Sequence, residues 1–270
     1  SILIGSAKDG KAAIIEKSPE KTVLFKGKES DRLISTNHYQ SEEFSKDERN
    51  MENIRTSDSP YRFARLEELI NENMPIDASK AASILRNHKG LQDADLGLAN
   101  EMAINQFIAH HSVIFQPEKR LMWVSTSPWQ CGKYVAYDLN KIFKGVRAEV
   151  VVRESPKKPK IEDLTIPADE FTETPEFQHL LTYKKLTPLL LKKIRKKEKI
   201  EEHVLKTYEA SNPSLYYVYE VMGDYYEAMQ QPQQAIAYWQ KALKKPIPKL
   251  QEKERIQQKI QKQSKDGKES

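Results

Sequence analysis

The sequence lacks the residues and runs on which several classes of protein depend. It contains one cysteine, Cys131, so an intrachain disulfide is excluded. It has no run of about 18 consecutive apolar residues, so its hydropathy predicts no membrane-spanning helix. No secretory signal opens the chain, but this absence carries no weight if residue 1 is an internal position of a longer protein. The compartment therefore stays open.

The residues that are present are largely polar. Hydrophobic residues make up 38% and charged residues 31% of the 270 residues, and the formal net charge is +5. Mean hydropathy is -0.73, which indicates that part of the chain is solvated helix or linker rather than packed core. The length suits one large domain or two smaller ones, and we expect two.

Strand-like and helical runs follow one another in blocks over the first 150 residues. Four short β-prone runs separated by turn signals predict an antiparallel meander, at residues 2–4, 12–16, 22–25 and 32–36. The apolar spacing becomes helical from Tyr61, and Asp77 is the predicted N-cap of a second helix. Residues 111–125 predict a hairpin with a four-residue loop, and residues 134–143 predict a strand followed by a turn of helix. Strands, then helices, then strands is the order of an α+β domain.

The composition changes after this region. Four prolines and several lysines in residues 151–175 favour an extended linker. The predicted domains are therefore an α+β domain at 1–150, a Pro/Lys linker at 151–175 and an α-helical domain at 176–270. Five helices are predicted in the last of these, at about residues 176–185, 188–210, 214–229, 232–244 and 249–262.

Gly223 has the spacing of a close-packing position in a helical hairpin. Tyr226 lies three residues on, and Ala235, Trp239 and Ala242 follow at offsets of twelve, sixteen and nineteen. This spacing resembles one tetratricopeptide repeat. A stable solenoid needs about three repeats, and only one clear copy is present. A groove that binds a protein partner and a hairpin that binds nothing are both open interpretations.

A basic cluster in the helical part raises the question of nucleic acid. Eight Lys and Arg residues lie within residues 184–199, where they could contact phosphates. No aromatic residue is interleaved for base stacking, and the cluster continues into Glu198, Glu201 and Glu202. We interpret it as the solvated face of a Lys/Glu-rich helix and predict no nucleic-acid binding.

The histidines and the cysteine predict neither a metal site nor a cofactor. His110 and His111 are adjacent, so on a strand they point to opposite faces, and no Asp, Glu or Cys cluster accompanies them or His38. Cys131 stands between two apolar runs without a strand-to-helix elbow. We interpret it as a structural or incidental thiol, with a nucleophile as the alternative.

Two short motifs contain the residues that we predict to take part in catalysis. Thr-Asn-His-Tyr at 36–39 closes a strand-like run and places the Asn37 amide where it can donate to a developing oxyanion. Tyr-Arg-Phe-Ala-Arg at 61–65 opens a helix and places Arg62 where it could hold a thiolate or carboxylate. A cation in a first helical turn opposes the helix dipole, which points to a nearby anion. The alternatives are a turn residue at Asn37 and a surface residue at Arg62.

The motifs, in this order, resemble the acyl-CoA:6-aminopenicillanic-acid acyltransferase family. These are N-terminal-nucleophile hydrolases related to the choloylglycine hydrolases. The Ser-rich stretch at 57–59 and the hairpin at 112–124 also contribute to the resemblance, which covers about residues 2–145. It implies the C-terminal portion of an αββα sandwich and acyl-enzyme chemistry on a linear amide or thioester, such as an acyl-CoA-type substrate. By motif, Asn37 is implied as the oxyanion donor and Arg62 as the residue beside the nucleophile.

The family's nucleophile, an N-terminal cysteine freed by processing, has no counterpart in the sequence. We therefore expect it upstream, with residue 1 as an internal position of a longer protein. A rival hypothesis makes Ser1 itself the processed nucleophile, because a small hydroxyl residue there leads into a strand. A second alternative is a non-enzymatic interaction module that uses the helical tail.

Overall fold

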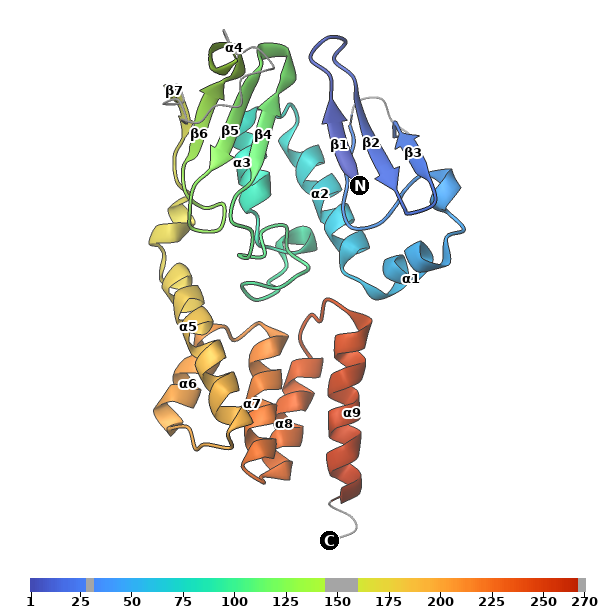
Figure 1. Cartoon of the computed structure of the whole chain (residues 1–270). Coiled ribbons are helices and arrows are strands. Elements are labelled where there is room, and N and C mark those ends of the chain that lie inside the picture. Colours follow the sequence, from blue (N-terminus) through green and yellow to red (C-terminus); the bar gives the residue numbers. More distant parts are fainter. Residues whose placement is uncertain (28–31, 144–159, 267–270) are drawn as a thin grey trace, which may run out of the picture. The chain divides into compact units, whose positions relative to one another are not determined.

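The computed structural model describes residues 1–27, 32–143 and 160–266, and the chain divides into two compact units (Figure 1). The first unit comprises residues 1–55, 59–87 and 107–169, and the second comprises residues 56–58, 88–106 and 170–270. The described residues mix helices with antiparallel sheets, which is compatible with the predicted α+β class. The domain limits drawn from the sequence stay predictions.

The first sheet contains three of the four predicted N-terminal strands. Strands β1 (Ile2–Gly5), β2 (Ala12–Lys17) and β3 (Thr22–Phe25) pair antiparallel in the order β1-β2-β3. The fourth prediction, a strand at 32–36, is wrong. The carbonyl of Ile34 accepts a hydrogen bond from the Gln40 side chain at 2.7 Å, so this backbone group is satisfied by a side chain rather than by a ladder.

The second sheet contains the predicted hairpin. Strands β4 (Val113–Gln116), β5 (Leu121–Ser125), β6 (Tyr134–Asp138) and β7 (Lys160–Ile166) follow in that order, all antiparallel. The short helix α4 (Leu139–Ile142) follows β6, as the sequence predicts. Strand β7 lies at the sheet edge within the predicted linker, whose residues 151–159 lie outside the described residues.

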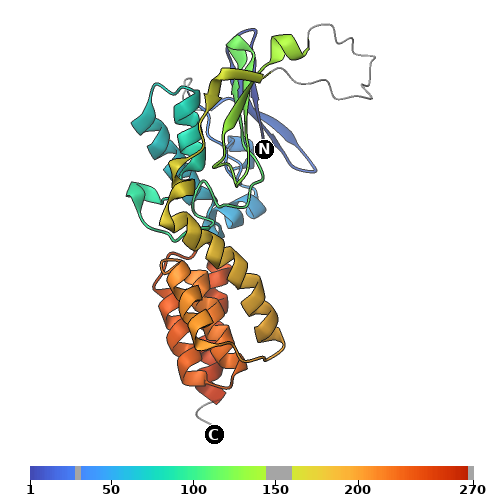
Figure 2. The ribbon, with the colours of Figure 1, turned by 90° about the vertical axis from the view of Figure 1, so that its left-hand side faces the viewer.

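Helix α3 (Ala78–Arg86) covers one face of the second sheet (Figure 2). The predicted cap is confirmed, because the Asp77 side chain accepts a hydrogen bond from the Lys80 amide at 2.8 Å. Ala82 packs in a buried cluster with Trp123 and Tyr134 from the strands. Helix α2 (Ser59–Asn73) contains the helical spacing predicted from Tyr61, and helix α1 (Glu48–Thr56) was not predicted.

The second unit is helical, with α5 (Pro175–Arg195), α6 (Glu202–Ser211), α7 (Tyr216–Ala228), α8 (Pro232–Leu243) and α9 (Leu250–Asp266). The predicted break before Pro188 is wrong, because α5 continues through that residue. The Thr187 hydroxyl donates to the Tyr183 carbonyl at 2.7 Å, one turn earlier, beside the place where proline lacks its N–H. The predicted helix 188–210 is also wrong: α5 ends at Arg195, and Lys197 has a left-handed φ of 54°.

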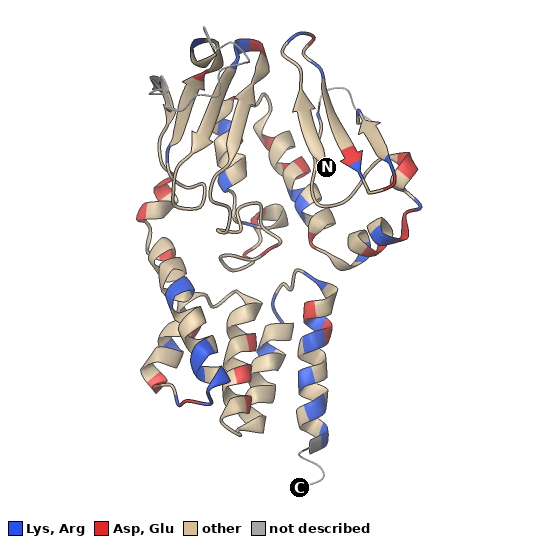
Figure 3. Ribbon diagram, viewed as in Figure 1, with Lys and Arg blue, Asp and Glu red and all other residues tan. Residues whose placement is uncertain are grey.

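The basic cluster carries partners of opposite sign. Within the cluster Lys196 pairs with Glu198 at 3.7 Å, and beyond it, on α6, Lys206 pairs with Glu202 at 2.7 Å, so both signs surround the loop between α5 and α6 (Figure 3). These exposed pairs are the pattern of a solvated surface. The absence of nucleic-acid binding stays a prediction.

A loop from the middle of the sequence packs onto the helices of the second unit. The Asn212 side chain accepts from the Leu98 amide at 3.0 Å and donates to the Leu98 carbonyl at 2.7 Å. Gly97 has a φ of 78°, and a Cβ there would lie 2.4 Å from the Leu215 nitrogen. Only glycine suits both the conformation and the close approach. Residues 88–106 are therefore an integral part of this unit.

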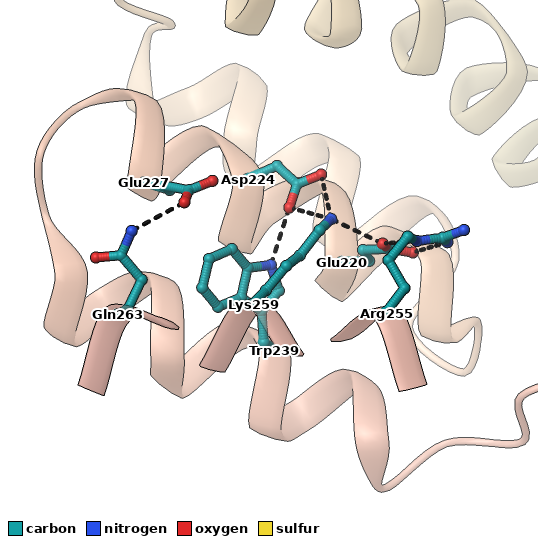
Figure 4. A network of polar contacts seen from close by, with 7 residues as sticks. All are labelled: Glu220, Asp224, Glu227, Trp239, Arg255, Lys259 and Gln263. Atoms are coloured by element: carbon teal, nitrogen blue, oxygen red, sulfur yellow. Dashed lines mark hydrogen bonds and ion pairs between the residues drawn. The ribbon is translucent and has the colours of Figure 1, made fainter. Parts of the chain in front are cut away.

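Helix α9 is fixed to the α7–α8 hairpin by a charged network (Figure 4). Glu220 of α7 accepts from the Arg255 guanidinium at 2.8 and 2.9 Å and from Lys259 at 2.8 Å. Lys259 also bonds Asp224 at 2.7 Å, which accepts from the Trp239 indole at 3.0 Å. Burial would raise the pKa of Glu220, but the hydrogen bonds from Arg255 and Lys259 outweigh it and lower the pKa.

Gly223 of α7 lies against Trp239 of α8. A Cβ at Gly223 would lie 2.4 Å from two indole atoms of Trp239, a residue with no solvent exposure. Ala235 and Ala242 of α8 are also fully buried. The small and bulky residues read from the sequence therefore lie in the core of this hairpin.

We expect Gly223→Ala to lower the free energy of unfolding by about 1 kcal/mol, because overpacking costs about 1–3 kcal/mol and alanine returns about 1 kcal/mol of helix propensity. Urea denaturation measures the effect. In a Trp239→Phe background, which removes the indole nitrogen that the new methyl group meets, the same change should cost less. An equal cost in both backgrounds would refute the contact as its cause.

Candidate functional site

The predicted motif at 36–39 forms a loop that is fixed by the start of helix α2. The Ser59 hydroxyl accepts a hydrogen bond from the backbone N–H of Asn37 at 2.7 Å and donates one to the Thr36 hydroxyl at 3.0 Å. It also lies 2.8 Å from Nδ1 of His38. Ser59 is fully buried, so these contacts are shielded from water. The loop conformation is therefore set by a side chain more than twenty residues away.

Two further buried side chains hold the other end of the loop. The Asn50 side chain accepts a hydrogen bond from the backbone N–H of Tyr39 at 2.8 Å and donates one to the Tyr39 carbonyl at 3.0 Å. This pair of bonds is the same as the one that a neighbouring strand would make. The carboxylate of Glu16 on β2 accepts from the amides of Gln40 and Ser41 at 2.6 and 3.0 Å. Side chains from β2, α1 and α2 thus substitute for the missing sheet ladder.

The structure brings the two predicted site residues together. Nη2 of Arg62 donates to Oδ1 of Asn37 at 2.6 Å, across 25 positions of sequence. Because the guanidinium takes the carbonyl end of the amide, the NH₂ end of Asn37 is the end that can donate to a substrate oxygen. Asn37 is exposed and Arg62 is half-buried, so a ligand can reach the amide.

Asn37 also lines a polar cavity of about 780 Å³. Its other walls include Ser18, Asp47, Arg49 and Asn53. This volume falls in the range of small-molecule sites, which is about 300–1,000 Å³. The exposed amide therefore has a space beside it large enough for a substrate.

His38 supports the loop from a half-buried position. Burial lowers the pKa of its imidazole, Glu16 opposes this effect and Arg62 adds to it. A lowered pKa favours the neutral imidazole, which can either donate to the Ser59 hydroxyl or accept from it. No group of three potential metal ligands is found among the described residues. The absence of a metal site stays a prediction.

Cys131 lies in a separate buried loop of the first unit. Its side chain has no solvent exposure, and its carbonyl accepts from the Asp169 amide at 2.8 Å. The neighbouring carbonyls of Gln130 and Gly132 accept from the guanidinium of Arg86. A thiol in this position is shielded from any substrate in the polar cavity, which favours the structural interpretation.

Sequence reasoning missed the residues that hold the site. Ser59 was visible only as part of a Ser-rich helix start, and Glu16 only as a polar residue in a strand of apolar neighbours. A charged residue at an inward strand position is an available signal, because such a group is rarely buried without partners. The identity of those partners depends on the fold.

Comparison with known proteins agrees with the resemblance seen in the motifs. Residues 2–127 match the family model of acyl-coenzyme A:6-aminopenicillanic acid acyl-transferase. No curated protein and no solved structure matches the chain significantly. The family match indicates an acyltransferase or hydrolase type of function and a small-molecule substrate.

No family match supports the repeat interpretation of the helical tail. No helix in the described part of the chain is long and apolar enough to cross a membrane.

Proposed function

We propose that the chain is part of an amidohydrolase or acyltransferase that attacks a linear amide or thioester carbonyl and forms an acyl-enzyme. The observation that carries the proposal is the 2.6 Å hydrogen bond between Arg62 and Asn37, which orients an exposed amide beside a polar cavity. An oriented amide N–H is the kind of donor that stabilises the oxyanion of acyl transfer. The family match over residues 2–127 supports the same reaction class.

Each residue has a defined role in the proposed mechanism. The α-amino group of the cysteine takes the thiol proton, and the thiolate attacks the carbonyl. The substrate's amine or thiol leaves with that proton, and water or an acceptor amine then cleaves the acyl-enzyme and restores the cysteine. Asn37 donates to the oxyanion through its NH₂ group. Arg62 holds the opposite end of that amide, and its charge favours a thiolate or carboxylate nearby. We propose that the nucleophilic cysteine is encoded upstream of residue 1.

Intact mass and N-terminal sequencing of the protein from its native source test this proposal. We expect a companion chain, or a longer polypeptide, with cysteine at its processed N-terminus. That preparation should hydrolyse acyl-CoA thioesters or N-acyl amides, and iodoacetamide should abolish the turnover by alkylating the cysteine. A native chain that begins at Ser1 and turns over none of these compounds would contradict the proposal.

The alternative is an interaction module without catalysis. The close approach of Gly223 and Trp239 supports this alternative, because repeat hairpins pack small against bulky residues and can present a groove to a protein partner. This alternative predicts a full-length gene with no upstream cysteine that processing could expose. The sequencing experiment therefore separates the two functions.

A further inference from the structure

Helix α5 presents a continuous stripe of exposed side chains to solvent. The exposed residues recur every three or four positions, so they lie along one side of the helix. Buried residues such as Tyr183 and Leu190 lie on the side that packs against α6 and α7. We call the exposed set the α5 stripe, and it consists of Gln178, Leu181, Lys185, Pro188, Leu189 and Lys192.

The charge along α5 has a single sign (Figure 3). Residues 177–197 contain seven Lys and Arg residues and no acidic residue. The glutamates with which the sequence grouped these lysines lie beyond α5, in the following loop and on α6. Lys185 and Lys192 form no ion pair with another described residue. A helix that only faces water usually alternates both signs, so the single sign indicates an anionic partner.

Apolar side chains interrupt the lysines of the α5 stripe. Leu181 is 38% exposed and Leu189 is 44% exposed, and Pro188 is exposed as well. A single exposed leucine needs no explanation, but these two lie about two turns apart on the same side of one helix. Lysine stems can lie along such a surface while their ammonium groups extend outward. The stripe therefore offers apolar contact and positive charge together.

This combination favours an anionic lipid surface over other anionic partners. A membrane interface uses both parts of the stripe, because headgroups attract the lysines and the acyl boundary takes up the leucines. Nucleic-acid phosphates would use only the lysines, and the stripe contains no aromatic residue for base stacking. An acidic peptide helix docks in a groove, whereas the stripe is the convex side of a single helix.

We propose that the α5 stripe is a peripheral binding surface for anionic lipid bilayers. Helix α5 lies in the plane of the interface, with Leu181 and Leu189 at the boundary between headgroups and acyl chains. Lys185 and Lys192 contact the anionic headgroups. The proposal does not depend on acyl transfer, because the stripe contains no residue of the first unit.

Cosedimentation of the full chain with lipid vesicles tests the proposal. The probe is a vesicle of phosphatidylcholine and phosphatidylserine in a ratio of about 3:1, compared with phosphatidylcholine alone. We expect saturable binding to the anionic vesicles only, and weaker binding at higher salt because ions screen the lysines. Lys185→Gln combined with Lys192→Gln should weaken binding about thirtyfold, the effect of two lysines at an anionic surface.

A second pair of changes tests the leucines without altering the charge. Leu181→Gln combined with Leu189→Gln should weaken binding about tenfold, because two partly exposed leucines no longer leave water. All four changed positions are exposed, and glutamine has nearly the helix propensity of lysine and leucine. The circular dichroism spectra of both double variants should therefore match that of the wild type.

Lys253→Gln combined with Lys262→Gln is the matched control. These lysines are exposed on α9, so the control loses the same charge and should bind vesicles as the wild type does. Equal losses in the two lysine pairs would mean that net charge alone drives binding and would overturn the proposal. Absence of wild-type binding, full binding by the leucine variant, or retention by duplex DNA but not by vesicles would overturn it too. Asn37→Ala should bind vesicles normally, so failure of the catalytic proposal is recognised separately.

Discussion

Asn37→Ala is expected to slow the chemical step by about a hundredfold or more in the processed, active protein. Removal of one oxyanion donor raises the barrier by about 2.7–4 kcal/mol in enzymes that form a tetrahedral intermediate. The change should have little effect on stability, because Asn37 is exposed and its side chain bonds only one described partner in the contacts seen, Arg62. Single-turnover kinetics with a substrate identified by screening would measure the effect.

Two companion variants show whether the lost group is the N–H donor. Asn37→Asp keeps the size and the bond to Arg62 but cannot donate when ionised, so it should lose rate as Asn37→Ala does. Lys46→Met changes another side chain that lines the same cavity, at an exposed position, and should retain most of the activity. An Asn37→Ala protein with more than a third of the wild-type turnover would eliminate the proposed role.

Arg86→Met is expected to cost about 3 kcal/mol or more of the free energy of unfolding. Arg86 is 8% exposed and donates to the carbonyls of Gln130, Gly132 and Pro167 at 3.3, 2.7 and 2.7 Å. A hydrogen bond to a charged group is worth about 1.5–3 kcal/mol, so the two bonds at 2.7 Å alone give at least about 3 kcal/mol. The guanidinium also lies 5.0 Å from the centre of the Tyr134 ring. Urea denaturation would measure the loss.

Arg55→Met provides the matched control for this prediction. Arg55 is exposed and pairs only locally with Glu52 at 2.6 Å in the contacts seen, and such surface pairs are worth less than about 1 kcal/mol. We therefore expect a change below about 0.5 kcal/mol for a surface substitution of this kind. If Arg86→Met and Arg55→Met destabilise the protein equally, Arg86 does not organise the loop that contains Cys131.

Local signals predicted much of the secondary structure and failed where tertiary contacts compete with them. Asp77 capped the expected helix, because a capping bond is made within four residues. Residues 32–36 looked like a strand, but Gln40 occupies a backbone carbonyl that a ladder would need. Pro188 looked like a helix boundary, but α5 continues through it while the Thr187 hydroxyl bonds the carbonyl of Tyr183.

The candidate site shows the same division between residue identity and geometry. The motif order predicted Asn37 and Arg62 as site residues, and in the structure Nη2 of Arg62 lies 2.6 Å from Oδ1 of Asn37. The hydrogen bonds by which Ser59, Asn50 and Glu16 hold this loop could not be predicted, because each side chain bonds a backbone group that is distant in sequence. When a side chain hydrogen-bonds a backbone N–H or C=O, the type of the residue that carries that backbone group does not reveal the bond.

The sequence by itself determined the elements made by short-range contacts and the residue types of the two motifs. The strands of the first meander, the hairpin, the Asp77 cap and the spacing around Gly223 all follow from neighbours on one chain segment. Only the tertiary structure decided which buried groups satisfy the loop at 36–41 and that residues 88–106 belong to the helical unit. The physical reason is that periodicity records which side of an element is buried, whereas the pairing of buried polar groups depends on segments brought together from far apart.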